Sequence, residues 1–418
     1  MERSRSARGS GLWEEPAAPA WRTRLWWIPL LMTALLVCSC GAFSGSGGGF
    51  DGERAEGAGK KSSPSKAEGW VVAAERMTVS RAAHTATPLP DGRVLVVGGC
   101  SLEGCEMADE GATAELYDPV ARSFARTGTM GVERVSHTAT SLPNGKVLVA
   151  GGWDRDGVLS SAELYDPATG DFSPAGDVAT GRAAHTASLL PDGRVLLCGG
   201  YDGERSLADA EVYDPKTNSF SGTDDMQTPR SAHATALLND GRVLVTGGSD
   251  SRENVVATAE IYDPDEGEFT RTGEMTVNRH KHAATTLEDG RVLVLGGSNA
   301  DDFYGKHASA EVFDPESDTF TAVSDMSAER FKLPDAVATL EGDSVLVGGG
   351  DERAEIYDPG SEVFRVVRGD MGAARMFATT TPLAGGRALI TGGYDQDINP
   401  TSKTWMYVPG DRVGASAS

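Results

Sequence analysis

Positive charge is scarce in this sequence. Its 38 lysine and arginine residues face 61 aspartate and glutamate residues, which gives a formal net charge of −23. A surface this acidic repels phosphate backbones, and no run of basic residues interleaved with aromatic residues offsets it. Nucleic acid is therefore not an expected partner.

The N-terminal region contains an uncharged stretch that is too short to span a membrane. Arg22 and Arg24 precede residues 25–37, which are 13 residues without a charge, whereas a spanning helix needs about 20. A short apolar segment after basic residues is typical of a secretory signal peptide, which we exclude from the fold. We therefore expect the protein to be exported.

The end of this stretch resembles a bacterial lipobox. Val37-Cys38-Ser39-Cys40 has an aliphatic residue three positions before Cys40 and a small residue just before it. The resemblance implies that residues 1–39 are a lipoprotein signal peptide and that Cys40 is the lipidation site, so the membrane is contacted by the lipid anchor only. We expect attachment to the outer membrane or cell surface in preference to the inner membrane. The alternative is a soluble secretory signal with Cys40 as a bystander.

Residues 40–69 are rich in Gly, Ser and Lys and are predicted to form a flexible tether. Beyond them, helical periodicity is absent and a repeat takes its place. A Gly-Gly pair after an aliphatic run occurs seven times, and Ala-Glu-(Leu/Val/Ile)-(Tyr/Phe)-Asp-Pro occurs six times. The first glycines of the pairs are Gly98, Gly151, Gly199, Gly247, Gly296, Gly349 and Gly392. Their regular spacing predicts a repeat architecture.

Each unit is predicted to contain four short strands, a to d, separated by turn signals. An Asp-Gly or Asn-Gly turn joins strand a to strand b, as at Asp91 and Gly92. Strand b, such as residues 93–97, is nearly all aliphatic, which is typical of a strand buried on both faces. Strand c ends at Asp-Pro because proline lacks the N–H of the ladder. An aromatic residue follows this Asp six positions later and marks strand d.

The unit resembles the kelch motif, which has a Gly-Gly pair, a later Tyr and an aromatic residue on the fourth strand. The resemblance covers residues 70–409 and implies an all-β fold, a seven-bladed β-propeller of four-stranded blades at 70–410, followed by a disordered tail at 411–418. The Trp-Asp repeat is excluded because no Trp-Asp dipeptide closes the units. The chain departs from the motif in placing Phe where kelch proteins usually have Trp, and its sixth unit has two extra residues and no His in residues 330–335.

The two ends of the repeat region predict how the ring closes. The seventh unit lacks a fourth strand after residues 404–409, and the first unit is preceded by an orphan strand at 70–77. Trp70 stands seven residues before Met77, as Phe364 stands before Met371. We therefore expect the N-terminal strand to complete the last blade, with Trp70 at its aromatic position and no sheet edge left open.

Three polar residue types recur at fixed places in the units. Arg is present in all seven units, Glu in strand c of six, and His three positions after Arg in five. These are Arg81, Arg134, Arg182, Arg230, Arg279, Arg330 and Arg375; Glu115, Glu163, Glu211, Glu260, Glu311 and Glu355; and His84, His137, His185, His233 and His282. An arginine ring could bind an anion, but a feature copied into every unit favours buried ion pairs. Histidines in separate blades would not converge on one ion, so we predict no metal and no cofactor.

Residue sets for catalysis are not recognisable. Galactose oxidase also has a kelch-type propeller, but its family needs a Cys–Tyr cross-link and copper ligands that come partly from a further C-terminal domain, whereas here nine residues follow Pro409. Cys198 is expected inside a strand b. Cys100 and Cys105 share a loop of an exported protein and predict a local disulfide, with two free thiols as the alternative.

The connections between strands b and c are the variable part of the repeat. Strand alternation places them, with the d–a connections, on one face of the disc. They hold aromatic residues beside acids, which suits protein or sugar recognition on a rigid scaffold; solvated acidic turns are the alternative. The candidate ligand-binding residues are Trp153, Asp154, Asp156, Tyr201, Asp202, Asp301, Asp302, Phe303, Tyr304, Tyr394 and Asp395.

The sequence therefore predicts a non-enzymatic recognition module, displayed on the cell envelope, that binds a protein or carbohydrate through the b–c face. A second hypothesis follows from the kelch resemblance, because periplasmic N-acetylneuraminate epimerases are also kelch propellers: the protein would then be a sugar-acting enzyme. A third is a structural envelope protein without a small ligand. We assign no catalytic residue.

Overall fold

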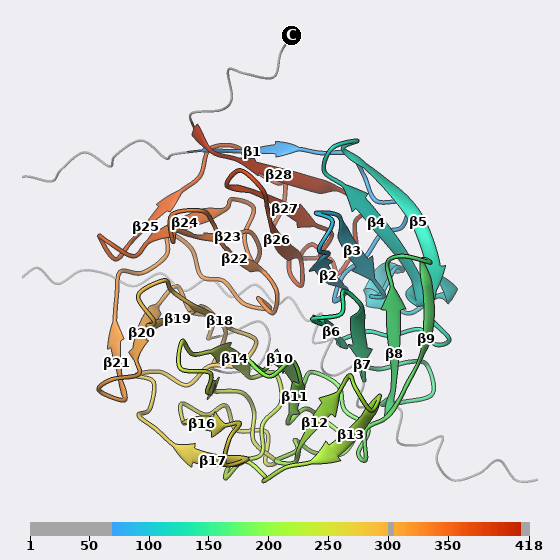
Figure 1. Ribbon diagram of the computed structural model, residues 1–418. Helices are drawn as coiled ribbons and strands as arrows, with labels where there is room; N and C mark the ends of the chain where they lie inside the picture. The colour runs from blue at the N-terminus through green and yellow to red at the C-terminus, as the bar shows by residue number, and fades with distance from the viewer. Residues whose placement is uncertain (1–68, 300–304, 411–418) are drawn as a thin grey trace, which may run out of the picture. The chain divides into compact units, whose positions relative to one another are not determined.

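The computed structural model describes residues 69–299 and 305–410. Within these residues, 28 strands form seven four-stranded antiparallel sheets, which stand as blades around a common centre (Figure 1). The predicted all-β, seven-bladed propeller is confirmed.

Blades one to three follow the order a, b, c, d from the centre to the rim. Blade one contains β2 (Thr85–Pro88), β3 (Val94–Val97), β4 (Thr113–Asp118) and β5 (Ser123–Thr129); blade two contains β6 (Thr138–Ser141), β7 (Val147–Ala150), β8 (Ser161–Asp166) and β9 (Asp171–Asp177); blade three contains β10 (Thr186–Leu189), β11 (Val195–Cys198), β12 (Ala210–Asp214) and β13 (Ser219–Gly222).

Blades four to six repeat this order. Blade four contains β14 (Ala234–Leu237), β15 (Val243–Thr246), β16 (Ala259–Asp263) and β17 (Glu268–Arg271); blade five contains β18 (Ala283–Thr286), β19 (Val292–Leu295), β20 (Ala310–Asp314) and β21 (Thr319–Ala322); blade six contains β22 (Val337–Thr339), β23 (Val345–Val347), β24 (Glu355–Asp358) and β25 (Val363–Val366). Short 3-10 turns, Glu103–Cys105 and Asp109–Ala112, lie between β3 and β4.

Blade seven joins the two ends of the propeller. Its strands are β26 (Thr379–Leu383), β27 (Arg387–Thr391) and β28 (Thr404–Val408), and β1 (Trp70–Ala73) pairs with β28 as the fourth strand. The N-terminal strand therefore closes the ring, as predicted.

The aromatic position of blade seven corrects one detail of that prediction. In the other blades the phenylalanine of strand d pairs with the aromatic residue of strand c, as Phe364 does with Tyr357. In blade seven the equivalent Tyr407 pairs with Val71, and Trp70 pairs with Val408. Val71 is therefore the buried residue at this position, while Trp70 is half-buried and lies under the Arg368 guanidinium, 5.0 Å from its ring centroid.

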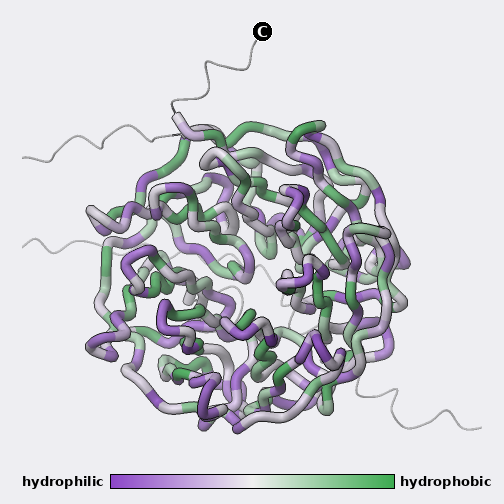
Figure 2. The backbone as a smooth tube through the Cα atoms, viewed as in Figure 1, coloured by the Kyte–Doolittle hydropathy of each residue, from purple (hydrophilic) through white to green (hydrophobic). Residues whose placement is uncertain are grey.

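The hydrophobic core is divided into layers between neighbouring blades. In blades one to six strand b is buried along its whole length, for example Val147–Ala150. One layer joins Leu95 and Val97 of blade one to Val147 and Val149 of blade two. Figure 2 shows hydrophobic segments in all parts of the ring rather than in one central cluster. In the described part of the chain, no helix is long and apolar enough to cross a membrane.

Candidate recognition face and central mouth

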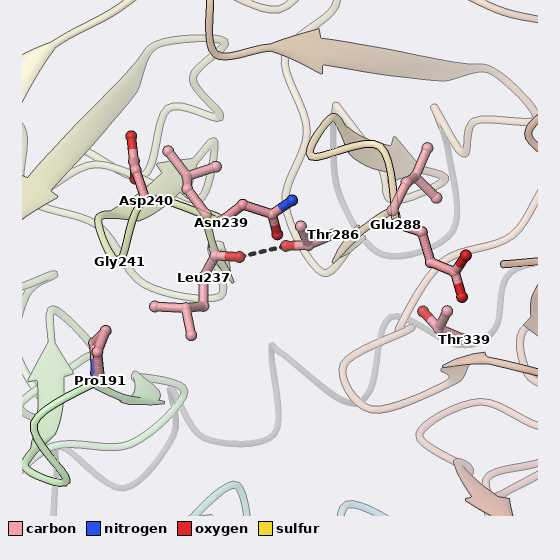
Figure 3. A pocket seen from close by; sticks show the side chains of 10 residues that line it. Pro191, Leu237, Asn239, Asp240, Gly241, Thr286, Glu288 and Thr339 are labelled. Carbon is pink, nitrogen blue, oxygen red and sulfur yellow. Dashed lines mark hydrogen bonds between the residues drawn. The ribbon is translucent and has the colours of Figure 1, made fainter.

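The face formed by the a–b and c–d turns contains the shallow cavities. One, of about 530 Å³, is lined by Pro191, Leu237, Asp240, Thr286 and Glu288 among others (Figure 3). A second, of about 500 Å³, adjoins it over the next turns. Its charged groups include the Asp240–Arg242 and Asp289–Arg291 ion pairs, which lie within single turns. Because neither cavity gathers unpaired, buried polar groups, we do not place the functional site on this face.

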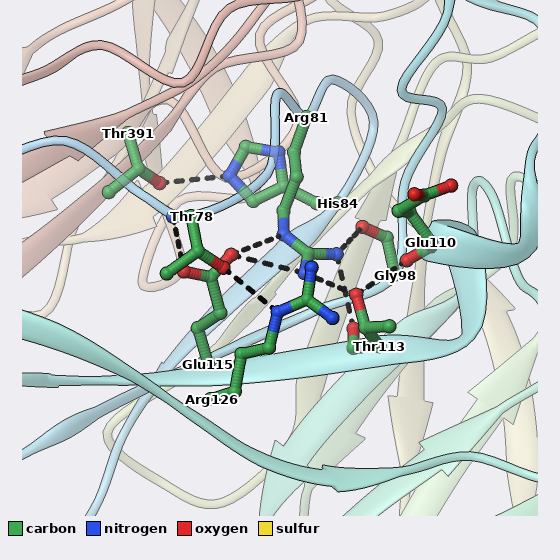
Figure 4. A network of polar contacts seen from close by, with 9 residues as sticks. All are labelled: Thr78, Arg81, His84, Gly98, Glu110, Thr113, Glu115, Arg126 and Thr391. Atoms are coloured by element: carbon green, nitrogen blue, oxygen red, sulfur yellow. Dashed lines mark hydrogen bonds and ion pairs between the residues drawn. The ribbon is translucent and has the colours of Figure 1, made fainter.

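Toward the opposite face, the recurrent arginines of blades one to six are each buried in a dense set of hydrogen bonds. Arg81 is fully buried; its guanidinium donates to Glu115, to the Gly98 carbonyl and to Thr113 (Figure 4). Equivalent Arg–Glu pairs, with N···O distances of 2.8 to 3.2 Å, occur in blades one to six. Burial lowers the pKa of Arg81, and the Glu115 charge acts in the opposite direction. These arginines hold strand c against the d–a link and are not exposed to a ligand.

The recurrent histidines connect neighbouring blades. His185 of blade three places Nε2 3.0 Å from the Thr138 hydroxyl of blade two. His84, His137, His233 and His282 make equivalent contacts to the preceding blade. In five of the seven Gly-Gly pairs the first glycine makes room for this imidazole ring: a Cβ at Gly151 would lie 2.8 Å from His185 Cε1. Burial, reinforced by the nearby arginine, lowers the pKa of His84 and His137 to about 3.

A closed ring of main-chain hydrogen bonds surrounds the centre on the face of the b–c loops. The residue two positions after each recurrent arginine has a left-handed conformation, with φ between 50° and 58°. These residues are Ala83, Ser136, Ala184, Ala232, Lys281, Lys332 and Phe377. Each link joins one blade to the next, from Ser136 N to Ala83 O and round to Ala83 N, which donates to Phe377 O. In blade six the amide that donates to Lys281 O is that of Leu333, while Lys332 O accepts from Phe377 N. We call these seven residues the mouth ring.

The mouth ring has two chemically different halves. Blades one to four contribute only alanine and serine, whereas blades five to seven contribute Lys281, Lys332 and Phe377. The repeat motif does not mark these positions. A positive φ is usually signalled by glycine in the sequence, but none of these residues is a glycine. They are not among the residues predicted from the sequence, although their fixed offset from the recurrent arginine could have revealed them.

Two of the predicted aromatic residues lie together beside the small half of the mouth ring. Trp153 pairs through its backbone with Val135, next to Ser136, and Tyr201 pairs with Ala183, next to Ala184. Their ring centroids are 5.8 Å apart and both side chains are half-buried. Each ring therefore presents part of its surface to solvent from a short, hydrogen-bonded loop.

The acids beside these rings mainly shape the loops. Asp154 Oδ1 accepts hydrogen bonds from the Asp156 and Gly157 amides, at 2.8 and 2.9 Å. Asp202 Oδ1 accepts from the amides of the second and third residues that follow it, and Asp395 accepts in a similar way. One oxygen of each of these three carboxylates therefore stabilises its own turn, in line with the alternative interpretation as acidic turns. The Asp156 side chain, by contrast, is exposed.

Tyr394 occupies a different environment from Trp153 and Tyr201. It is 1% exposed, its ring centroid lies 5.8 Å from that of Phe377, and its hydroxyl accepts a hydrogen bond of 2.7 Å from Lys332 Nζ. Phe331 completes the surroundings of this ammonium group, with its centroid 5.0 Å away. Tyr394 was predicted as a candidate ligand-binding residue, but its ring is part of the packing. Asp301, Asp302, Phe303 and Tyr304 lie outside the described residues.

Cys100 and Cys105 form a disulfide in the b–c loop of blade one. The Gly104 amide of this loop donates to the Ile398 carbonyl in the b–c loop of blade seven, at 3.0 Å. The disulfide loop thus contacts the blade that joins the two ends. Cys198 is buried in β11, and burial raises the pKa of its thiol to about 11.

Charge is distributed unevenly over the b–c face. The b–c loops of blades one to four contain eleven acidic residues and three arginines. The acids are Glu103, Glu106, Asp109, Glu110, Asp154, Asp156, Asp202, Glu204, Asp209, Asp250 and Glu253, and the bases are Arg155, Arg205 and Arg252. The b–c loops of blades five and six contain four acids and two bases, and the adjacent mouth ring adds Lys281 and Lys332, so this side carries less net negative charge. The acids are Asp301, Asp302, Asp351 and Glu352, and the bases are Lys306 and Arg353. Among the residues that the structure covers, no group of three or more His, Cys, Asp or Glu is placed to hold a metal ion.

A closed ring of seven four-stranded blades, each with a Gly-Gly pair after strand b, defines a kelch-type β-propeller. The KLHDC2/KLHL20/DRC7 Kelch-repeats domain matches residues 137–350, and the chain belongs to this kelch-repeat family. No curated protein matches the sequence.

Solved structures share the fold at low sequence identity. One is a fungal alcohol oxidase of the AA5 family in complex with copper, which is 15% identical, with a TM-score of 0.66 over 82% of this chain and 76% of that chain. At this identity the likeness concerns the fold alone.

Proposed function

We propose that this protein is a non-enzymatic recognition module that binds a protein or glycan through its b–c face. The observation that carries the proposal is the Trp153–Tyr201 pair, which is partly exposed on short loops beside the mouth ring. Aromatic residues on rigid, solvent-facing loops are typical of binding surfaces. The repeated Arg, Glu and His residues do not compete for this role, because their contacts are internal to the propeller.

The test compares substitutions on the two faces. Trp153→Ala with Tyr201→Ala should abolish binding in a glycan array or in a pull-down from envelope extract. Asn144→Ala with Asp192→Ala, in the a–b turns, should leave binding intact. Loss of binding from the a–b pair alone would place the site on the other face and refute the proposal.

Display on the cell envelope is a further part of the proposal, and it is supported by the lipobox-like sequence before Cys40. Residues 1–68 lie outside the described part of the chain. Cys40→Ala should move the protein from the detergent-dependent membrane fraction to the soluble exported fraction. A wild-type protein that is already soluble without detergent would contradict the anchor.

A further inference from the structure

The partly exposed aromatic pair lies within the acidic half of the b–c face. Trp153 is followed by Asp154 and Asp156, and Tyr201 by Asp202 and Glu204. Neither the Trp153 indole N–H nor the Tyr201 hydroxyl has a hydrogen-bond partner among the described residues. The polar ends of both rings are therefore available to a bound molecule.

The carboxylates around Tyr201 come from two neighbouring loops. Burial raises the pKa of Tyr201, and the charges of Glu253 in blade four and of Asp202 and Glu204 in blade three act on its hydroxyl in the same direction. Glu204 and Glu253 are exposed and form no ion pair within the part of the chain that the structure covers. Negative charge thus converges on one side of the aromatic pair.

The nearby arginines cancel only part of this charge. Arg155 is already paired with Asp109 and Glu133, at 3.1 and 2.9 Å. Arg205 lies 3.7 Å from Asp202, and Arg252 shares its loop with Asp250 and Glu253. An anionic ligand would be repelled from this surface. A neutral sugar could stack on the rings and donate its hydroxyls to the carboxylates, but it would leave their excess negative charge without a counter-charge. A cation gains from both, because ammonium and guanidinium groups are attracted by aromatic faces as well as by carboxylates.

We propose that the b–c face over blades two to four, centred on Trp153 and Tyr201, binds a segment of a partner protein that carries lysine or arginine side chains. This inference rests on the proposed recognition function and narrows it to one class of partner. The rings would hold the stems and charged heads of the basic side chains, and Asp156, Glu204 and Glu253 would pair with their charges.

The experiment measures binding of a labelled octa-arginine peptide to the full chain in detergent, with octa-glutamate and a neutral N-acetylglucosamine oligomer as comparison probes. The peptide should bind, and binding should weaken as salt shortens the Debye length from about 30 Å to about 10 Å. Trp153→Ala with Tyr201→Ala should weaken it by about tenfold or more, as expected for central aromatic residues of an interface.

A matched pair of triple variants separates site binding from general attraction to an acidic protein. Asp156→Asn, Glu204→Gln and Glu253→Gln should together weaken peptide binding by about tenfold, a few-fold for each exposed charge pair. Asp265→Asn, Glu266→Gln and Glu316→Gln remove the same charge from exposed positions on the opposite face and should change the affinity less than about twofold.

Equal weakening by both triple variants, or no effect of the aromatic substitutions, would overturn the inference. Tighter, ring-dependent binding of the neutral oligomer or of octa-glutamate would also overturn it, while leaving the recognition function in place. Failure of the proposed recognition function would give a different result. In that case, substitutions on the b–c face would not change the capture of any glycan or envelope protein.

Discussion

Trp405 occupies the position on strand c of blade seven that a glutamate holds in the six other blades, and the Arg375 guanidinium lies 5.3 Å from its ring centroid. Ile390 pairs with Trp405 just as Val347 pairs with Glu355 in blade six. Blade seven therefore replaces a buried ion pair with a cation–π contact. Burial lowers the pKa of Arg375, and the Nε atom of its guanidinium has no hydrogen-bond partner.

This difference predicts unequal effects of the same substitution. Arg230→Met should lower the free energy of unfolding by about 3 kcal/mol or more, because it leaves the Glu260 carboxylate buried without its cation. Arg375→Met should lower the free energy of unfolding by less than about 1.5 kcal/mol, since it leaves no buried charge without a partner. Urea unfolding of the two variants measures the difference. Equal losses would mean that the arginines contribute through packing alone.

Ring closure predicts the result of two N-terminal truncations. Removing residues 1–69 should leave the stability of the propeller nearly unchanged. Removing residues 1–78 deletes β1, with buried Val71 and Met77, and unpairs one edge of β28. The free energy of unfolding should then fall by at least about 3 kcal/mol through lost apolar burial and ladder hydrogen bonds. Identical melting temperatures for the two truncations would contradict closure by β1.

The inter-blade histidines predict a loss of stability in mild acid. The pKa of His84, His137 and His233 is about 3 in the folded protein and about 6.5 in the unfolded chain. Between these values the unfolded chain binds more protons, so stability is full above pH 6.5 and falls as the pH drops toward 3. Each such histidine contributes about 1.4 kcal/mol per pH unit in this window.

His233→Gln tests this dependence. Between about pH 6 and pH 4, the slope of unfolding free energy against pH should decrease by about one proton relative to the wild type. His307, which is half-buried, provides the control, because His307→Gln should change the slope much less. An unchanged slope in the His233 variant would show that this histidine is accessible to protons in the folded state.

The different burial of Tyr394 and Tyr201 predicts that their substitution by alanine lowers stability by different amounts. Tyr394→Ala should cost about 3–5 kcal/mol, since it empties a buried aromatic position. Tyr201→Ala, at a partly exposed ring, should cost about 1 kcal/mol. Thermal unfolding of both variants decides the matter, and similar losses would mean that Tyr201 is also part of the packing.

The blades could be predicted from sequence because every blade packs against its neighbours in the same way. In five blades the Gly-Gly pair accommodates the histidine of the next blade, and the aliphatic strand b fills the layer between neighbours, so both signals are repeated. The alignment of Trp70 with Phe364 was wrong by one residue because the link to Met371 is one residue longer than in the other blades. In five blades these two positions are six residues apart in sequence, as are Val71 and Met77.

The site was only partly predictable. Trp153 and Tyr201 follow a Gly-Gly pair directly, which fixed their place on the b–c face. Tyr394 also follows a Gly-Gly pair, yet the segment of blade six that contains Phe331 and Lys332 covers its side chain. The burial of Tyr394 thus depends on a contact between loops more than sixty residues apart, which no local pattern reports.

In the mouth ring, main-chain atoms rather than side chains connect neighbouring blades. Its hydrogen bonds use only main-chain atoms, and its left-handed residues include alanine, serine, lysine and phenylalanine. The identity of these seven side chains is therefore not constrained by ring closure. They form a set of addressable positions around one axis, at which new binding specificity could be introduced by substituting Ala83, Ser136, Ala184 or Ala232 while the scaffold is kept.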